Sequence, residues 1–224
     1  MKAEIHRLSL GICNCYVIKE EGVILVDTGP PHQKVKFLKK LKNLSIKPEE
    51  IALIFLTHGH WDHAGSVNEL KKLTGCKVAV NRYEKDWVEK ALKIIPPGVN
   101  LWGRFLSLVM KILVPFAKFS GTSADLVLEN VEFSVEPFGI QGKIIHTPGH
   151  SPGSMSLLLD SGEAFVGDLA MYGFPKLTKN AMPLFAGNPG HVKESWMKIL
   201  NMGARWIYPA HGRRFKADEL KKLL

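Results

Sequence analysis

Residues 57–65 read Thr-His-Gly-His-Trp-Asp-His-Ala-Gly and follow directly on the apolar run Ile-Ala-Leu-Ile-Phe-Leu at 51–56. A short apolar run bounded by polar residues predicts a buried β-strand. Imidazole and carboxylate groups packed this closely are typical of a metal site, because both bind borderline divalent ions such as zinc. The stretch therefore predicts a metal site at the end of a buried strand.

The spacing within 58–63 divides these side chains into two pairs. His58 and His60 alternate in an extended loop and can point to the same side of the strand end. Asp62 and His63 lie where a helix is expected to begin, so they would point to a second position. Because four ligands so close in sequence would crowd one ion, we expect two neighbouring metal ions.

Three further candidate ligands each follow a predicted strand. They are His150 after 143–146, Asp168 after 164–166 and His211 after 205–208. Loops that follow strands carry binding residues on a rigid scaffold. The chain thus offers enough ligands, at matching places, for a second ion.

The rest of the chain reads as strands alternating with helices. Further strands are expected at 4–8, 14–18, 22–27, 77–80, 126–133 and 155–159. Helices are expected at 31–44, 63–73, 192–201 and 217–224. Two β-rich halves, each followed by helices, predict two packed sheets with helices outside them. The length of 224 residues fits a single domain, 1–224.

A helical apolar insertion is expected at about 83–120. Residues 101–119 are almost wholly apolar apart from Arg104, Lys111 and Lys118, which recur every seven residues and share one helical stripe. Three interpretations stay open. The helix packs on the domain's own surface, it forms a lid or apolar wall over the active site, or it contacts a second copy or a membrane surface.

Composition adds broader expectations. The 30 basic and 21 acidic side chains give a net charge of +9, which favours anionic substrates, although lysine runs at helical spacing also indicate solvated helix faces. Nucleic acid is a less favoured partner, because basic and aromatic residues are not interleaved. The three cysteines do not form a disulfide framework by their number and spacing, and residues 1–6 lack a secretory pattern, so a cytoplasmic protein is expected.

These motifs, in this order, resemble those of the metallo-β-lactamase-fold hydrolase superfamily, from Asp27 to His211. The resemblance implies an α/β (α+β) fold, a four-layer αββα sandwich of two mixed β-sheets with outer helices. It also implies a binuclear site at one edge, with a ligand set similar to that of glyoxalase II and of the lactonases of this fold. Two divalent ions are expected, zinc first, with iron or manganese as alternatives.

The resemblance also implies a role for each candidate residue. The first ion would be held by His58, His60 and His150. The second would be held by Asp62, His63 and His211. Asp168 would bridge the two ions, and Asp27 in Val26-Asp27-Thr28-Gly29 would orient a ligating histidine. Tyr172 and His191 are candidate substrate contacts.

The leading functional hypothesis is hydrolysis of a carboxylic ester, thioester or lactone by a metal-bridging hydroxide. Asp62 or Asp168 would then carry the proton to the leaving group. The substrate would be a small apolar or anionic molecule, selected by 83–120 and by the loop 169–190. Alternatives are a phosphodiesterase or nuclease of the same fold, a mononuclear-iron persulfide dioxygenase, and a non-enzymatic metal-binding or membrane-surface adaptor.

Overall fold

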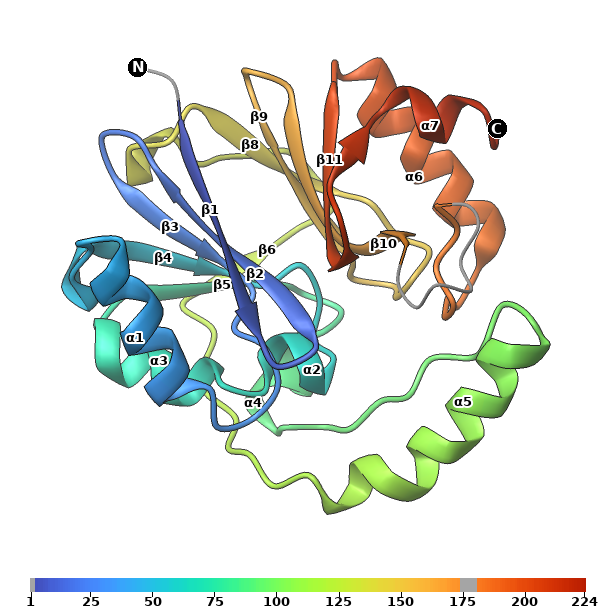
Figure 1. Ribbon diagram of the computed structural model, residues 1–224, viewed down its shortest axis with the longest axis horizontal. Helices are drawn as coiled ribbons and strands as arrows, with labels where there is room; N and C mark the ends of the chain where they lie inside the picture. The colour runs from blue at the N-terminus through green and yellow to red at the C-terminus, as the bar shows by residue number, and fades with distance from the viewer. Residues whose placement is uncertain (1–2, 174–180) are drawn as a thin grey trace.

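Two six-stranded sheets lie face to face in the computed structural model, which describes residues 3–173 and 181–224 (Figure 1). The first sheet consists of β1 (Glu4–Leu10), β2 (Cys13–Lys19), β3 (Val23–Val26), β4 (Ile51–Phe55), β5 (Lys77–Asn81) and β6 (Leu126–Leu128), in that order. Strands β1 to β3 pair antiparallel, whereas β3 to β6 pair parallel. The sheet is therefore mixed.

The second sheet has the order β12-β11-β10-β9-β8-β7. Its strands are β7 (Phe133–Ser134), β8 (Gly142–His146), β9 (Met155–Leu159), β10 (Glu163–Tyr172), β11 (Trp206–Gly212) and β12 (Phe215–Lys216). Only β10 and β11 pair parallel, and the other neighbours are antiparallel. This sheet is also mixed.

Helices cover both outer faces of the sandwich. The described residues form the helices α1 (Lys34–Asn43), α2 (Trp61–Ala64), α3 (Val67–Thr74), α4 (Lys85–Glu89), α5 (Leu101–Leu113), α6 (Pro189–Asn201) and α7 (Asp218–Lys221). Short 3-10 turns lie at Pro48–Glu50, Val114–Phe116 and Glu136–Phe138. Helices α1 and α3 pack on the first sheet, and α6 packs on the second (Figure 1). The predicted αββα sandwich is confirmed.

The core has three apolar layers that follow from this arrangement. Phe55 of the first sheet and Phe165 of the second belong to the layer between the sheets. Phe37 of α1 packs on the outside of the first sheet, and Trp196 of α6 packs on the outside of the second. All four side chains are fully buried, so each of the three layers excludes water at these positions.

The predicted strand 126–133 is wrong. Its first part is β6 and its last residue begins β7, and the two strands belong to different sheets. The intervening residues 129–132 are exposed and carry the chain from one sheet to the other. The apolar residues on either side of the crossing had suggested one continuous strand.

Two other strands are longer than expected. The strand predicted at 164–166 continues to Tyr172, and that predicted at 205–208 continues to Gly212. Asp168 and His211 therefore lie within strands and not in the loops after them. The β10–β11 pairing is interrupted by register shifts on both sides of Gly167, and such irregularities re-aim side chains near functional sites.

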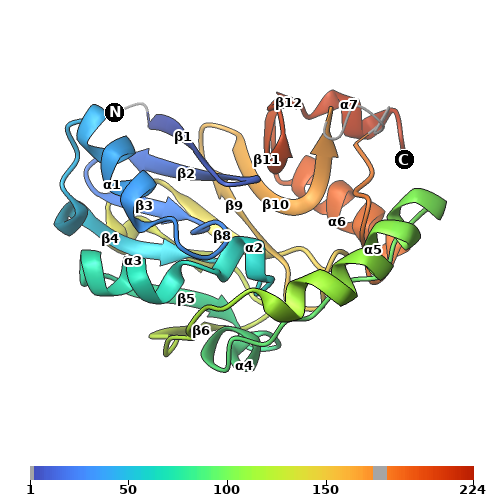
Figure 2. The same cartoon turned by 60° about the horizontal axis from the view of Figure 1, so that its bottom comes forward.

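Several helix boundaries also differ from those expected. The helix predicted at 63–73 is two helices, α2 and α3, and the one predicted at 101–119 ends at Leu113 before Pro115, which cannot continue a helix. Helix α5 lies alongside the sandwich on two long connecting segments (Figure 2). Among the described residues, no helix is long and apolar enough to cross a membrane.

Candidate metal centre

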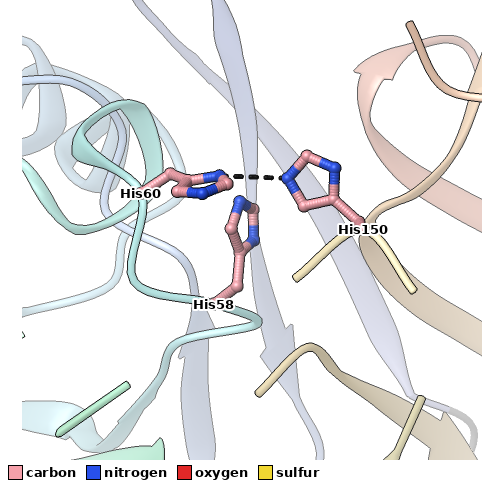
Figure 3. Close-up of side chains that lie close together, drawn as sticks. All are labelled: His58, His60 and His150. Atoms are coloured by element: carbon pink, nitrogen blue, oxygen red, sulfur yellow. Dashed lines mark hydrogen bonds between the residues drawn. The ribbon is translucent and has the colours of Figure 1, made fainter. Parts of the chain in front are cut away.

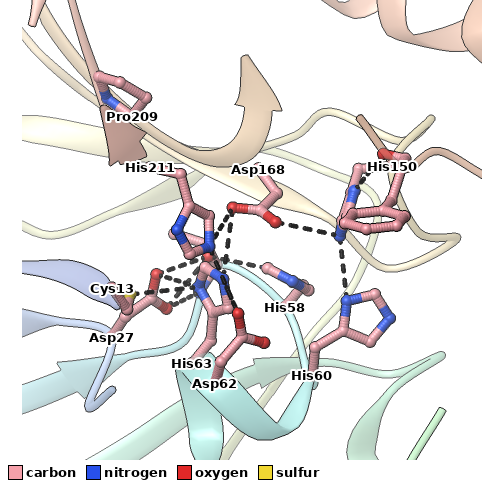
Figure 4. Close-up of polar contacts among 12 residues, drawn as sticks. Cys13, Asp27, His58, His60, Asp62, His63, His150, Asp168, Pro209 and His211 are labelled. Carbon is pink, nitrogen blue, oxygen red and sulfur yellow. Dashed lines mark hydrogen bonds and ion pairs between the residues drawn. The ribbon is translucent and has the colours of Figure 1, made fainter. Parts of the chain in front are cut away.

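All seven predicted ligands meet at one edge of the sandwich (Figure 4). His58 and His60 lie in the loop between β4 and α2, and Asp62 and His63 belong to α2. The others come from the second half of the chain: His150 from the loop between β8 and β9, Asp168 from β10 and His211 from β11. Six of the seven are buried, and Asp62 is partly exposed.

The first group is made of three histidines (Figure 3). Nδ1 of His60 lies 3.0 Å from Nε2 of His150. The ring of His58 has its centroid 4.6 Å from the centroids of both other rings. One nitrogen of each ring lies within 4.8 Å of the others, a spacing that lets three imidazoles share an ion.

A second group combines a carboxylate with two histidines. Nε2 of His211 lies 3.3 Å from Oδ2 of Asp62, and Nε2 of His63 lies 3.9 Å from the same oxygen. These three ligand atoms also lie within 4.8 Å of one another. The two groups are formed by different residues, and they are adjacent because His58 and His63 have ring centroids only 4.0 Å apart.

The carboxylate of Asp168 lies between the two groups. Its Oδ2 atom is 3.7 Å from Nε2 of His150 in the first group. Its Oδ1 atom is 3.3 Å from Nε2 of His63 and 3.3 Å from Nε2 of His211 in the second. Each oxygen of one carboxylate thus faces a different group, which is the arrangement that a bridging ligand requires.

Asp27 lies next to this centre, beside His63 (Figure 4). Its Oδ2 accepts a hydrogen bond of 2.8 Å from Nδ1 of His63, and its Oδ1 accepts one of 2.8 Å from the backbone N–H of Thr57. The Thr57 hydroxyl, which also donates to Asp27, lies 3.1 Å from Nδ1 of His58. The carboxylate therefore orients the ring of His63 directly, as partners of metal-binding histidines do, and reaches His58 only through Thr57.

Backbone carbonyls orient two more rings. Nδ1 of His150 donates to the carbonyl oxygen of Phe185 at 2.8 Å, and Nδ1 of His211 donates to that of Ile12 at 3.0 Å. In each ring the proton sits on Nδ1, so the lone pair of Nε2 points to the centre. The fold thus selects the tautomer that can bind a metal.

The first group is held neutral. Burial lowers the pKa of His58 well below its usual value, and the neighbouring histidines lower it further. Burial and the adjacent His150 lower the pKa of His60 to about 3. Burial also lowers the pKa of His150. Neutral imidazole is the form that coordinates metal ions.

The second group has the opposite electrostatics. Burial opposes a charge on His63, but its acidic neighbours, Asp168 among them, raise its pKa well above the usual value. Burial likewise disfavours charge on His211, and Asp168 and Asp62 raise its pKa. The pKa of Asp168 is lowered by the two histidines in spite of its burial. The buried carboxylates of Asp62 and Asp168 are stabilised by positive charge beside them, either protons on the two histidines or bound metal ions.

Unpaired polar atoms show that the residues fit divalent metal ions. Nε2 of His58, Nε2 of His63 and Oδ1 of Asp168 are buried and have no hydrogen-bond partner among the described residues. Leaving such an atom unsatisfied costs about 1–3 kcal/mol. All three atoms point into the two groups, and nitrogen and carboxylate oxygen are donors that zinc, iron and manganese accept.

A cavity of about 100 Å³ opens onto the centre. His60, Asp62, His150, Asp168 and His211 form its polar floor. Its other lining residues are mostly apolar, namely Ile12, Ile94, Pro96, Met110, Met171, Leu184 and Phe185. Since Ile94, Pro96 and Met110 belong to the insertion, this part of the chain forms one wall of the cavity.

Sequence reasoning missed Glu84, which lies just after β5. Its side chain is fully buried and accepts hydrogen bonds from the backbone N–H groups of Gly59 and Gly153. Gly59 separates His58 from His60, and Gly153 belongs to the loop of His150. A single acidic residue in a polar stretch gives no local signal of this role, which exists only because the two loops meet in space.

The predicted substrate contacts do not reach the cavity. Tyr172 stacks on Phe215 with ring centroids 4.7 Å apart, and Arg213 lies over its ring. His191 is exposed on α6. Neither residue lines the cavity among the described parts of the chain. The predicted substrate loop 169–190 includes 174–180, which fall outside the described residues.

The fold and the order of the motifs agree with comparisons to known proteins. The model of the metallo-beta-lactamase superfamily matches residues 8–211, so the chain belongs to this family. Among solved structures, the BLEG-1 B3 metallo-beta-lactamase superposes with a TM-score of 0.76 at 23% identity, covering 98% of this chain and 97% of that one. An archaeal superfamily protein, ST1585 from Sulfolobus tokodaii, gives 0.69 at 22% identity and covers 100% and 86%. At these identities the likeness concerns the fold.

Curated relatives are also distant. A probable metallo-hydrolase, YflN of Bacillus subtilis, is 28% identical over 166 residues, which are 72% of this chain and 62% of that protein. An N-acyl homoserine lactonase of Bacillus cereus is 26% identical over 175 residues, 66% of this chain and 58% of its own length. The chain thus spans about 60% of the length of these two relatives.

Proposed function

We propose that this chain is a dinuclear metal-dependent hydrolase of small carboxylic esters, thioesters or lactones. His58, His60 and His150 would hold one ion. Asp62, His63 and His211 would hold the other. The observation that carries the proposal is the position of Asp168, whose two oxygens face the two groups separately. Zinc is the first expectation, with iron and manganese as alternatives.

The chemistry requires no serine or cysteine nucleophile. Divalent ions bound at this centre would lower the pKa of a coordinated water from 15.7 to about 7 and so supply a nucleophile at neutral pH. Asp62 and Asp168 both border the cavity. Either carboxylate would accept a proton on that side and deliver it to the leaving group. The hydrogen bonds that Asp27 accepts from His63 and that Glu84 accepts from the ligand-bearing loops keep the histidines in place while this occurs.

The cavity supports an acyl substrate. One side of the cavity is the polar floor, and the other is an apolar wall that includes Ile12 and Met110. A carbonyl group would lie on the floor, and its acyl chain would lie against the apolar wall. The lactonase activity in the name of one relative and the hydrolase activity in the name of another fit this class of reaction. The apolar wall favours a small acyl substrate over a phosphodiester.

The test combines metal analysis with three substrates. The protein is purified without added metal, its ions are counted, and it is assayed on a thioester, a lactone and bis-p-nitrophenyl phosphate. About two ions per chain and turnover of a carbonyl substrate are expected. His58→Ala and Asp168→Ala should abolish turnover, whereas His6→Ala, far from the centre, should leave it unchanged.

Other outcomes would contradict the proposal in distinct ways. One tightly bound iron with oxygen uptake on a persulfide would indicate a dioxygenase. Faster turnover of the phosphodiester would indicate a nuclease-like enzyme. A fully metallated, folded protein without activity on any of these substrates would indicate a metal-binding protein that is not an enzyme.

A further inference from the structure

Helix α5 presents most of its large apolar side chains to solvent, and its fully buried residues are small. Its buried residues are Gly103 and Ser107. Its exposed apolar residues, together with those of the turn that follows, are Leu101, Trp102, Phe105, Leu108, Ile112, Leu113 and Phe116. An ordinary surface helix turns its apolar face to the core. Here that face has no covering among the described residues.

Contacts on the inner side fix the helix in this orientation. The Ser107 hydroxyl donates a 2.9 Å hydrogen bond to the carbonyl oxygen of Pro96. Gly103 lies against the carbonyl oxygen of Leu184, and a Cβ at this position would come within 2.4 Å of that oxygen. The backbone N–H of Val99 donates to the same carbonyl at 2.9 Å. Rotation of α5 to bury its apolar side chains would break these contacts.

Charge defines what can cover the exposed face. Between residues 91 and 124 the chain carries four basic side chains and no acidic one. Two of them, Arg104 and Lys111, lie seven residues apart along one border of the exposed apolar face of α5. Neither forms an ion pair with a described residue. An apolar surface with a cationic border complements an anionic lipid headgroup layer.

A second copy of the chain is a poorer complement. Two-fold pairing of this face would bring the same surface of each copy together. It would supply no acidic side chain to Arg104 or Lys111, because this segment contains none. An anionic lipid bilayer supplies both complements of this face: an apolar layer for its apolar side chains and negative charge for its basic border.

We propose that α5 binds the surface of an anionic lipid bilayer, lying parallel to it with Phe105, Leu108 and Ile112 inserted below the headgroups. Arg104 and Lys111 contact the lipid phosphates. Met110, on the same helix, lines the cavity, so the apolar wall of the cavity lies next to the lipid surface. Lipid binding does not depend on catalytic activity, so it can be measured without an activity assay.

The experiment is co-sedimentation of the metal-loaded protein with vesicles. One set contains phosphatidylglycerol and phosphatidylcholine, and the other contains phosphatidylcholine alone. The variant Phe105→Ser/Leu108→Ser/Ile112→Ser removes the apolar stripe, and Arg104→Gln/Lys111→Gln removes the charges. Matched controls change exposed residues elsewhere: Val35→Ser/Val131→Ser/Met197→Ser for the first, and Lys36→Gln/Lys39→Gln for the second.

We expect binding to the anionic vesicles that weakens as salt is added, since screening reduces charge attraction. The triple serine variant should lose affinity about 100-fold or more, and the double glutamine variant about 30-fold, while both controls bind as the parent protein does. Circular dichroism checks that each variant is folded. The proposal is overturned if the parent protein binds neither vesicle, or if controls and α5 variants lose affinity equally. A dimer through α5 would also overturn it. In that case the parent protein would sediment as a dimer that does not bind vesicles, and only the triple serine variant would sediment as a monomer.

Discussion

Oε1 of Glu84 lies 2.8 Å from the backbone nitrogen of Gly153, and the other oxygen of the same carboxylate accepts the N–H of Gly59. This carboxylate joins the loop that carries His58 and His60 to the loop that carries His150. A Cβ on Gly153 would lie 2.8 Å from Cγ of Glu84, so the backbone of Gly153 lies directly against the Glu84 side chain. The first group of histidines depends on this junction.

Glu84→Gln should therefore weaken the first metal site selectively. Glutamine has one acceptor oxygen, so its NH2 group would face one of the two backbone N–H donors. Loss of a partner that orients metal ligands typically costs 10–100-fold in metal affinity. Zinc titration of the metal-free protein by calorimetry should show weaker binding of one ion and little change for the other.

Glu20→Gln is the matched control, because Glu20 also accepts a backbone N–H, that of Gln141, but on the exposed surface. It should leave both zinc affinities unchanged. Equal weakening of both ions in Glu84→Gln would show a general loss of stability and would contradict the specific role of Glu84.

Asp27→Asn should weaken the second metal site. Asparagine keeps the acceptor for Thr57 but turns an NH2 group toward Nδ1 of His63, where two donors would meet. The ring of His63 must then move its proton to Nε2, which removes the lone pair that faces Asp62. Asp27 has a φ of 59°, a conformation that asparagine tolerates, so the backbone is preserved.

Calorimetric titration with zinc should show a 10–100-fold loss for one ion in Asp27→Asn, with the folded state intact by circular dichroism. The stronger test is a double variant with Glu84→Gln. If Asp27 and Glu84 support different sites, the double variant weakens both ions. If the two substitutions weaken the same ion, the division of the centre into two groups is wrong.

The clustering of the candidate metal ligands was partly predictable because part of its signal is local. The spacing of His58, His60, Asp62 and His63 after an apolar strand can be recognised without knowledge of the rest of the fold. The resemblance then supplied the partners from the second sheet. The sandwich itself was predictable because strands and helices alternate in two halves.

The remaining features depend on contacts between distant segments. Glu84 lies 69 residues from Gly153 in sequence, so no spacing rule connects them. The strand error at 126–133 arose because apolar residues stand on both sides of the crossing between the sheets. The outward orientation of α5 could not be predicted either, since an apolar helix is ordinarily expected to bury that face. Hydrogen bonds from Ser107 and Val99 decide it instead.

Acid should destabilise the metal-free protein through His60. Its pKa is lowered from 6.5 to about 3 in the folded state by burial and by His150. Between these values the unfolded chain binds a proton that the folded chain does not, so the free energy of unfolding falls as pH falls below about 6.5. From pH 6.5 to pH 5 this single group should cost roughly 1.5 kcal/mol.

Urea denaturation of the metal-free protein at both pH values measures the effect. The fall in the free energy of unfolding from pH 6.5 to pH 5 should be smaller by roughly 1.5 kcal/mol in His60→Asn than in the parent protein. It should be unchanged in His32→Asn, which replaces an exposed histidine. The same loss in the parent protein and in His60→Asn would show that His60 is not held neutral. Bound metal should suppress the effect because it competes with the proton for the ring.

The inward side of α5 should set the preference for acyl chain length. Met110 lines the cavity, whereas Leu108 on the same helix is 61% exposed. Each buried CH2 group contributes about 0.8 kcal/mol, or about fourfold, if its burial is realised in the transition state. With soluble p-nitrophenyl acetate, propionate and butyrate, kcat/KM should therefore rise with chain length in the parent protein. Met110→Ser should flatten this increase, and Leu108→Ser should preserve it. If both substitutions have the same effect, the wall formed by α5 does not contact the acyl chain, and only the polar floor of the cavity selects the substrate.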